Sequence, residues 1–299
     1  MIAARDPNGF RPLVLGRLNH GYIVASETCA LDLIGAKYIR EVMPGEILYI
    51  TKEGIETAQI PSKNTPSMCI FEHVYFSRPD SIVFGDCSHE IRKAFGAKLA
   101  LEHPVEADLV MSIPDSGNSA ALGYAEQSGI PFEFGMTRNH YVGRTFIQPK
   151  QKIRDFSVKV KLNPIVGVLK GKRVIVVDDS VVRGTTSKHR IETIRQAGAK
   201  EIHLRISSPP IVGPCRFGVD TPDKKKLIAA NQTLEEIREF IGCDSIGYLS
   251  RKGMLDCVKA YPPENFCTGC FTGKYPVRVR NKGKFAFESK HKIKTFEGD

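Results

Sequence analysis

The residues with the clearest chemical potential are two adjacent carboxylates, Asp178 and Asp179, within the segment KRVIVVDDSVVRGTTS at positions 172–187. Neighbouring carboxylates repel each other unless a cation or hydroxyl donors hold them, and Mg²⁺ prefers a few carboxylates together with phosphate oxygens. A hydroxyl-rich turn follows and leads into a helical pattern, and a helix N-terminus offers backbone N–H groups and a dipole that bind phosphate. The segment therefore predicts a sugar-phosphate site, with the carboxylates on ribose hydroxyls and the loop on the phosphate.

A plainer interpretation of the same residues stays open at this point. The carboxylate pair could end a strand in a solvated turn, with one Asp serving only as a helix cap. The loop contains neither G-x-x-x-x-G-K nor G-x-G-x-x-G, so it is neither a P-loop nor a Rossmann dinucleotide site.

The elements that position this pair are predicted from the apolar pattern. Residues 174–177 form an apolar run too short for a helix, which indicates a strand buried on both faces. A helix is predicted over residues 187–199, because Ile191, Ile194 and Ala197 share one face. The carboxylates would then lie at the carboxyl end of a buried strand.

From residue 68 onward, strand-like and helix-like segments alternate. Helices are predicted over 88–103, with Ser88 as the cap, and over 233–242, between Thr233 and Gly242. Strands are predicted at 107–114, 131–134 and 201–208, and a strand–helix pair at 245–258. This order predicts a mostly parallel sheet that binds ligands at its carboxyl edge. A second polar junction, Asp115-Ser116-Gly117-Asn118-Ser119, would fall on the same edge as the carboxylate pair.

The first 62 residues have a different, β-rich character. Strand-like runs cover 10–18 and 21–27, a short helix is predicted over 30–42, and residues 45–60 predict a hairpin that turns at 52–54. The segment PSKNTPS at 61–67 has the prolines and small polar residues of a boundary.

Composition limits the class of protein. The chain has 299 residues, enough for two domains, with 41% hydrophobic and 25% charged residues. No run is long enough to span a bilayer, and the first residues resemble neither a signal nor a transit peptide, so a cytoplasmic α/β protein is expected. The net charge of +10 fits an anionic substrate or a nucleic-acid partner. Eight cysteines without a secretory signal favour metal ligands or free thiols over disulfides.

Two basic segments have little periodicity. Residues 135–165 form a long polar stretch, which inside a compact domain is either functional or a misassigned element. The end of the chain, from residue 277, carries mostly basic charges and reads as a solvated tail or as a basic arm for nucleic acid.

Several strings together resemble one family, the glutamine phosphoribosylpyrophosphate amidotransferases or amidophosphoribosyltransferases. They are ARDPNGFRPL, CIFEHVYFSRPDS, NHYVGRTFIQP, VDDSVVRGTTS, RISSPPI with PCRFGVD, and FCTGCFTGKYP, and the likeness covers about residues 3–277. The family joins an N-terminal-nucleophile glutaminase domain to a type I phosphoribosyltransferase domain. The resemblance implies an α/β phosphoribosyltransferase fold at 67–276, a partial β-rich glutaminase-type domain at 1–66 and a basic tail at 277–299.

The resemblance also implies the reaction and its residues. Ammonia displaces pyrophosphate from phosphoribosyl pyrophosphate (PRPP), giving 5-phosphoribosylamine in the first committed step of purine biosynthesis. Asp115, Ser116 and Gly117 resemble the pyrophosphate loop, and Asp178 and Asp179, with Ser116 nearby, are the expected Mg²⁺ and ribose ligands. The loop expected to hold the 5′-phosphate comprises Ser180, Val181, Val182, Arg183, Gly184, Thr185, Thr186 and Ser187. The closing loop at 135–165 brings the catalytic candidates Arg138, Tyr141, Arg144 and Lys161.

The cysteines follow the pattern of the family members that carry an iron–sulfur cluster. The resemblance implies a 4Fe-4S cluster on Cys69, Cys215, Cys267 and Cys270. From the residues alone, the C-x-x-C at 267–270 could equally be half a zinc site, a redox pair or neither.

One departure from the family pattern concerns the nitrogen source. The family's glutaminase nucleophile is an N-terminal cysteine, but Cys29, the first cysteine here, lies in SETCALDLIG, which does not resemble that position. Glutamine hydrolysis is therefore expected to be absent, with ammonia as the donor. The resemblance further implies a homotetramer inhibited by purine nucleotides. A PRPP-binding regulator that binds DNA without catalysis, which the long loop argues against, and an inactive fragment are the alternatives.

Overall fold

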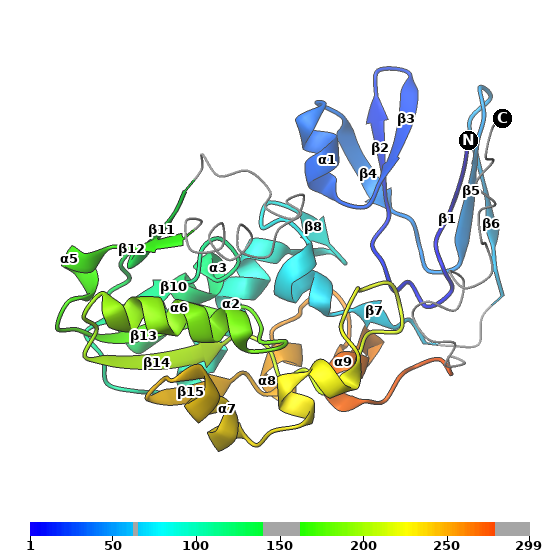
Figure 1. Cartoon of the computed structure of the whole chain (residues 1–299). Coiled ribbons are helices and arrows are strands. Elements are labelled where there is room, and N and C mark those ends of the chain that lie inside the picture. The colour runs from blue at the N-terminus through cyan, green and yellow to red at the C-terminus, as the bar shows by residue number, and fades with distance from the viewer. Residues whose placement is uncertain (62–64, 140–161, 279–299) are drawn as a thin grey trace, which may run out of the picture.

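The structure is a computed structural model that describes residues 1–61, 65–139 and 162–278. Figure 1 shows β1–β6 and α1 projecting from a larger α/β part built around a central sheet. Among the described residues, no helix combines the length and the apolar character needed to cross a membrane.

The central sheet has four parallel strands in the order β10-β13-β14-β15. The strands are β10 (Leu109–Ser112), β13 (Arg173–Asp178), β14 (Glu201–Ile206) and β15 (Ser245–Tyr248). Ser112 pairs with Val177, so β10 and β13 end at the same edge. The parallel sheet and the shared edge predicted from the sequence are confirmed.

Helices cover both faces of this sheet. On one face, α2 (Ser88–Glu102) and α3 (Asn118–Ser128) pack against the side chains of Val110, Ile175 and Val177. On the other, α6 (Thr185–Gln196) and α7 (Leu234–Ile241) pack against alternate residues of the same strands, including Val174 and Val176. The apolar run predicted to be buried on both faces is therefore buried in two separate cores.

The remaining elements of the larger part are short. α5 (Val166–Leu169), α8 (Arg251–Leu255) and α9 (Gly269–Thr272) are helices of at most five residues. The strand pairs are β7 (Met68–Cys69) with β16 (Phe266–Cys267), β8 (Ile82–Val83) with β9 (Asp86–Cys87), and β11 (Met136–Arg138) with β12 (Leu162–Pro164). Single turns are η1 (Glu72–Phe76), η3 (Lys224–Lys226), η4 (Ile228–Ala230) and η5 (Pro263–Asn265).

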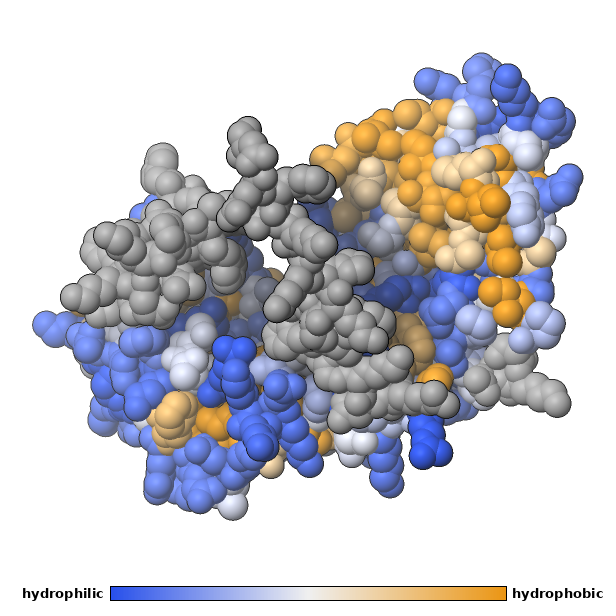
Figure 2. Space-filling view, turned by 45° about the vertical axis from the view of Figure 1, so that its right-hand side comes forward, coloured by the Kyte–Doolittle hydropathy of each residue, from blue (hydrophilic) through white to orange (hydrophobic). Residues whose placement is uncertain are grey.

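The N-terminal part consists of two three-stranded antiparallel sheets. One contains β1 (Ile2–Ala4), β5 (Glu46–Ile50) and β6 (Ile55–Gln59), and the other β2 (Val14–Leu18), β3 (Gly21–Ala25) and β4 (Lys37–Glu41). Pairing of Ile50 with Ile55 confirms the predicted hairpin. Figure 2 shows apolar surface over this part of the molecule. Leu33 and Ile39 are among its exposed apolar residues.

Three local predictions were wrong. The helix expected over 30–42 is only α1 (Thr28–Leu33), since Gly35 adopts a left-handed φ of 68° and the chain continues as β4. Ser88 does not cap α2, because it lies inside the helix and its hydroxyl bonds Ser77 at 2.7 Å. The strand expected at 131–134 is a single bridge between Phe132 and Val110. By contrast, Thr233 caps α7 in a capping box and Gly242 ends it, as predicted.

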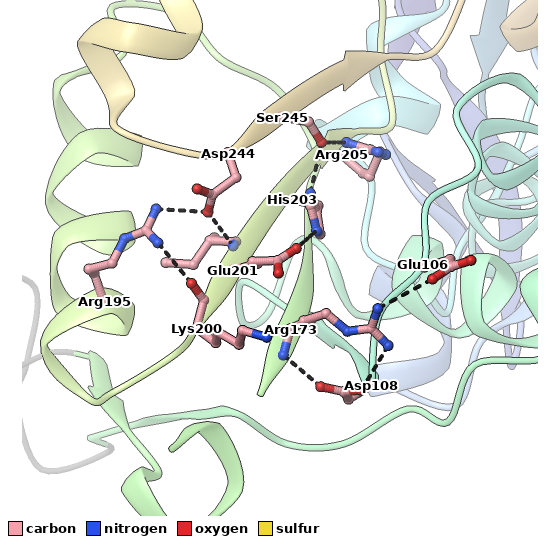
Figure 3. A network of polar contacts seen from close by, with 11 residues as sticks. Glu106, Asp108, Arg173, Arg195, Lys200, Glu201, His203, Arg205, Asp244 and Ser245 are labelled. Carbon is pink, nitrogen blue, oxygen red and sulfur yellow. Dashed lines mark hydrogen bonds and ion pairs between the residues drawn. The ribbon is translucent and has the colours of Figure 1, made fainter. Parts of the chain in front are cut away.

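The amino ends of the central strands carry charged side chains that pair with one another (Figure 3). Arg173 of β13 donates to Asp108 at 3.1 Å, and Arg195 of α6 donates to Asp244 at 2.9 Å. Asp108 and Asp244 at this edge are thus neutralised within the protein.

One buried residue gives a testable pH dependence. His73 of η1 is fully buried beside Phe84 and Phe266, and neither ring nitrogen has a hydrogen-bond partner among the described residues. Burial lowers the pKa of His73 from 6.5 to about 4. Between these values the unfolded chain binds a proton that the folded chain does not, so stability falls as pH falls through this window.

We expect His73→Phe to reduce the loss of stability that occurs as the pH falls. Between pH 7 and pH 5 the His73 ring accounts for a decrease of about 2 kcal/mol in the free energy of unfolding, measurable by urea denaturation at both pH values. The exposed His20 provides the control, since His20→Phe should leave the difference between the two pH values unchanged. An equal pH dependence in wild type and His73→Phe would contradict the assignment.

Candidate active site

A large cleft opens at the carboxyl edge of the central sheet, where β10 leads into α3 and β13 leads into α6. Its volume is about 1160 Å³. Residues of the predicted site that line it are Asp115, Ser116, Arg138, Asp178, Asp179, Ser180, Val182, Arg183, Gly184, Thr185, Thr186 and Ser187. The 115–119 junction and the 178–187 loop are distant in the chain. They meet here because β10 and β13, the strands that precede them, are parallel neighbours.

The two carboxylates are buried at the base of this cleft. Asp178 is 2% and Asp179 6% exposed. One carboxylate oxygen of Asp178 accepts from the Asp179 N–H at 3.0 Å and the other from Arg190 at 2.8 Å. Asp179 accepts from the Ser180 hydroxyl at 2.5 Å.

The environment of the pair disfavours two negative charges. Burial raises the pKa of Asp178, the guanidinium of Arg190 opposes that rise, and the Asp179 carboxylate adds to it. A cation or ribose hydroxyls bound at the pair would stabilise its ionised form, which is the arrangement predicted from the sequence. Mg²⁺ is commonly held by one or two carboxylates plus substrate phosphates, so this donor set fits that ion.

The loop after the carboxylates leads into the N-terminus of α6. Gly184 has a left-handed φ of 76° and precedes the first residue of α6, Thr185. No side chain caps α6 within the described structure, so the interpretation of an Asp as its cap is not supported. The first backbone N–H groups of a helix have no partner within it. These groups and the hydroxyls of Thr185, Thr186 and Ser187 therefore form a phosphate-sized donor set at the cleft.

Not every predicted residue points into the cleft. Val181 is buried in the core under α6, so only its backbone is available to a ligand. Gly117 does not line the cleft but packs against β13. Arg138 and Asp115 both line the cleft and form an ion pair with each other. Tyr141, Arg144 and Lys161 lie outside the described residues.

Three basic side chains on or beside helices α2 and α6 at this cleft were missed by the sequence analysis, as was Arg78, which lies before α2. Arg190 contacts Asp178; Arg92, which is 5% exposed, donates to the carbonyls of His73 and Ser77; His89 contacts the Ser119 hydroxyl at 2.9 Å. Arg and His on an amphipathic helix look like solvated residues in the sequence, so no signal marked them. Their positions at the cleft follow from the way α2 and α6 pack around it.

A second, smaller cavity collects the four cysteines predicted to bind a cluster. Cys69, Cys215, Cys267 and Cys270 all line it, together with aromatic residues such as Phe10 and Phe71. The pairing of β7 with β16 places Cys69 opposite Cys267. Burial raises the pKa of the Cys69 thiol to about 12, although the nearby Arg11 opposes that rise.

The described part of the structure gives no direct support for a metal ion or a cluster at the cysteine cavity. Among residues 1–61, 65–139 and 162–278, no three His, Cys, Asp or Glu side chains lie close enough to hold one metal ion. In a structural zinc site all four ligands bind the same ion at about 2.3 Å, so their sulfurs must converge.

Comparison with known proteins places these features in context. No family model matches the chain. Amidophosphoribosyltransferase 1, chloroplastic, of Arabidopsis thaliana is 57% identical over 282 residues, which are 93% of this chain and 49% of that protein. Amidophosphoribosyltransferase of Bacillus subtilis (strain 168) is 51% identical over 93% of this chain and 59% of its own length.

Solved structures give the same result. That of glutamine PRPP amidotransferase from B. subtilis, complexed with ADP and GMP, superposes with a TM-score of 0.88 at 49% identity, covering 96% of this chain and 64% of that one. Another, described as the allosteric regulatory enzyme of purine biosynthesis, has a TM-score of 0.87 at 49% identity, covering 94% and 61%. The chain spans about half the length of the first curated relatives. Over the part that it spans, the chain belongs to the amidophosphoribosyltransferase family and has the type I phosphoribosyltransferase fold.

Proposed function

We propose that this chain transfers the phosphoribosyl group of PRPP to ammonia, giving 5-phosphoribosylamine and pyrophosphate. The observation that carries the proposal is the buried Asp178–Asp179 pair, which lies beside an anion-binding helix N-terminus in one cleft. In the reaction a C1–N bond forms, the bond from C1 to the pyrophosphate oxygen breaks, and the nitrogen releases a proton to solvent.

The described residues have separate roles in this proposal. The loop 180–187 holds the 5′-phosphate, and the carboxylates orient the ribose hydroxyls, so that C1 faces the incoming nitrogen. Bound Mg²⁺, with Asp178, Asp179 and Ser116 as its proposed neighbours, supplies charge neutralisation for the pyrophosphate. Arg138 and the backbone of Asp115 and Ser116 lie where the leaving group would develop negative charge. Tyr141, Arg144 and Lys161 remain proposed catalytic residues of the loop that covers PRPP.

Ammonia is the proposed donor for this chain. Cys29 is buried and its thiol contacts Glu27 at 3.8 Å, which argues against its acting as an exposed nucleophile. The direct test supplies PRPP, Mg²⁺ and ammonium and measures pyrophosphate release, with glutamine in place of ammonium as the comparison. PRPP binding without ammonia-dependent turnover would refute catalysis and favour a PRPP-binding regulator.

We also propose that residues 1–66, 67–276 and 277–299 are the glutaminase-type part, the transferase and a basic tail. Contacts between the first two parts support a structural role for the former. Glu27, which precedes α1, accepts from the Arg78 N–H and the Ser81 hydroxyl, both at 2.8 Å. Arg78 lines the cleft, so the N-terminal part helps to hold one of its walls.

A 4Fe-4S cluster on Cys69, Cys215, Cys267 and Cys270 is the proposed occupant of the cysteine cavity. We expect anaerobically purified protein to be brown with about four iron atoms per chain. Cys267→Ser should lose the colour and most of the iron. Cys243→Ser, which changes a buried thiol elsewhere, should keep both. A colourless wild-type protein that contains zinc would refute the cluster.

Regulation and assembly extend the proposal. Because the related B. subtilis structure is complexed with ADP and GMP, we propose that purine nucleotides bind and inhibit this chain. A homotetramer is also proposed, on the family resemblance alone. Some relatives are chloroplastic and others bacterial, so the cytoplasm stays a prediction from the sequence.

A further inference from the structure

Arg190 makes a contact that the resemblance did not assign. It lies in the second turn of α6, lines the cleft and donates to Asp178 at 2.8 Å. Its side chain is 27% exposed, whereas that of Asp178 is 3% exposed. A buried carboxylate is thus paired with an arginine that reaches in from the cleft wall.

The contact completes the hydrogen bonding of Asp178. One of its oxygens is held by the backbone of Asp179 and the other by Arg190, so the carboxylate is fixed from two sides. Removing one partner of a buried ion pair leaves an uncompensated buried charge, which is strongly unfavourable. In this protein the uncompensated charge would be that of Asp178, at the end of β13 and next to Asp179.

Other cations at the cleft have different hydrogen-bond partners among the described residues, although Arg92 also interacts electrostatically with Asp179. Arg92 donates to the carbonyls of His73 and Ser77, and Arg138 pairs with Asp115. Arg78 pairs with Asp80. Of the cleft arginines with an ion pair among the described residues, Arg190 is the one that pairs with the Asp178–Asp179 unit.

We propose that Arg190 is a positioning residue for the reaction proposed above: it holds the Asp178 carboxylate in place, so that Asp178 and Asp179 present a fixed arrangement to the ribose of PRPP. The inference rests on the proposed function, but it concerns a residue outside the phosphate loop. Arg190 acts through Asp178 and does not itself contact PRPP.

The test is a double-mutant cycle with PRPP binding as its readout. Arg190→Met should weaken PRPP binding, measured by calorimetry with Mg²⁺, by at least about 30-fold, because a buried charge loses its partner. In the Asp178→Asn background the same substitution should change binding less than about threefold, since the charge that it positioned is gone. Arg190→Lys should bind within about fivefold of wild type, because a single ion-pair contact does not need the guanidinium fork.

A matched control lies on the same helix. Arg195→Met removes an equal charge from α6 but breaks a pair with Asp244 at the opposite edge of the sheet (Figure 3), and should leave PRPP affinity unchanged. Unchanged affinity in Arg190→Met would overturn the inference. An equal loss in the Asp178→Asn background would also overturn it, by showing direct contact between Arg190 and PRPP.

Two further measurements keep the test decisive. If wild-type protein does not bind PRPP, the proposed function fails, but thermal unfolding still tests the contact: Arg190→Met should lower the melting temperature by at least about 5 °C in wild type and by much less in the Asp178→Asn background. If Asp178→Asn does not fold, the test compares Arg190→Gln with Arg190→Lys instead. Glutamine keeps part of the length of the side chain but carries no charge. If Arg190→Gln bound PRPP as tightly as Arg190→Lys, the charge of Arg190 would not be needed and its positioning role would be refuted.

Discussion

Asp179→Asn is expected to lower kcat/KM for PRPP in the ammonia-dependent reaction by about 100-fold or more, while the protein still folds. Asp179 is buried at the base of the cleft, with the Ser180 hydroxyl on one oxygen. The amide keeps the shape of the side chain but removes its charge and replaces one acceptor oxygen with an NH₂ donor. Ribose hydroxyls and a cation would both lose a partner. Initial rates of pyrophosphate release measure the effect.

The matched control is Asp108→Asn, which makes the same chemical change beside the amino end of β10. Asp108 pairs with Arg173 there (Figure 3), and neither residue lines the cleft. Because an exposed ion pair contributes little, kcat/KM should stay within about threefold of wild type. If Asp179→Asn and its control had equal activity, the carboxylate pair would not be the centre of the reaction.

Much of this site could be predicted because its signal is local. A buried parallel strand reads as a continuous apolar run, and the polar residues that follow it must emerge at the carboxyl edge. This reasoning placed Asp178 and the 115–119 junction on one edge, and the pairing of β10 with β13 confirms it. The capping box of Thr233 was equally local.

The remaining features depend on contacts between distant segments. Ser88 had the sequence of a cap, but tertiary packing placed its hydroxyl on Ser77. Arg190 looked like a solvated helix residue until α6 was packed beside the end of β13. The gathering of four cysteines from positions 69 to 270 came from the family resemblance alone, because no periodicity relates such distant residues.

At Gly117 the 115–119 junction packs tightly against the end of β13. A Cβ added there would lie 2.4 Å from the Val177 carbonyl oxygen and 3.1 Å from that of Ile113. The Val177 carbonyl already accepts from the Ile113 N–H at 2.9 Å and belongs to the residue before Asp178. A backbone oxygen in a central strand cannot move away cheaply, so the loop carrying Asp115 and Ser116 must shift instead.

We therefore expect Gly117→Ala to lower kcat/KM for PRPP by about 100-fold, because a displacement near 1 Å at a reacting site has an effect of that size. Overpacking should also destabilise the fold by about 1–3 kcal/mol, seen as a lower urea midpoint. Gly167→Ala in α5 is the control, since a Cβ there meets no atom within 4 Å, and both activity and stability should be retained. Full activity in Gly117→Ala would show that the 115–117 loop does not contact PRPP.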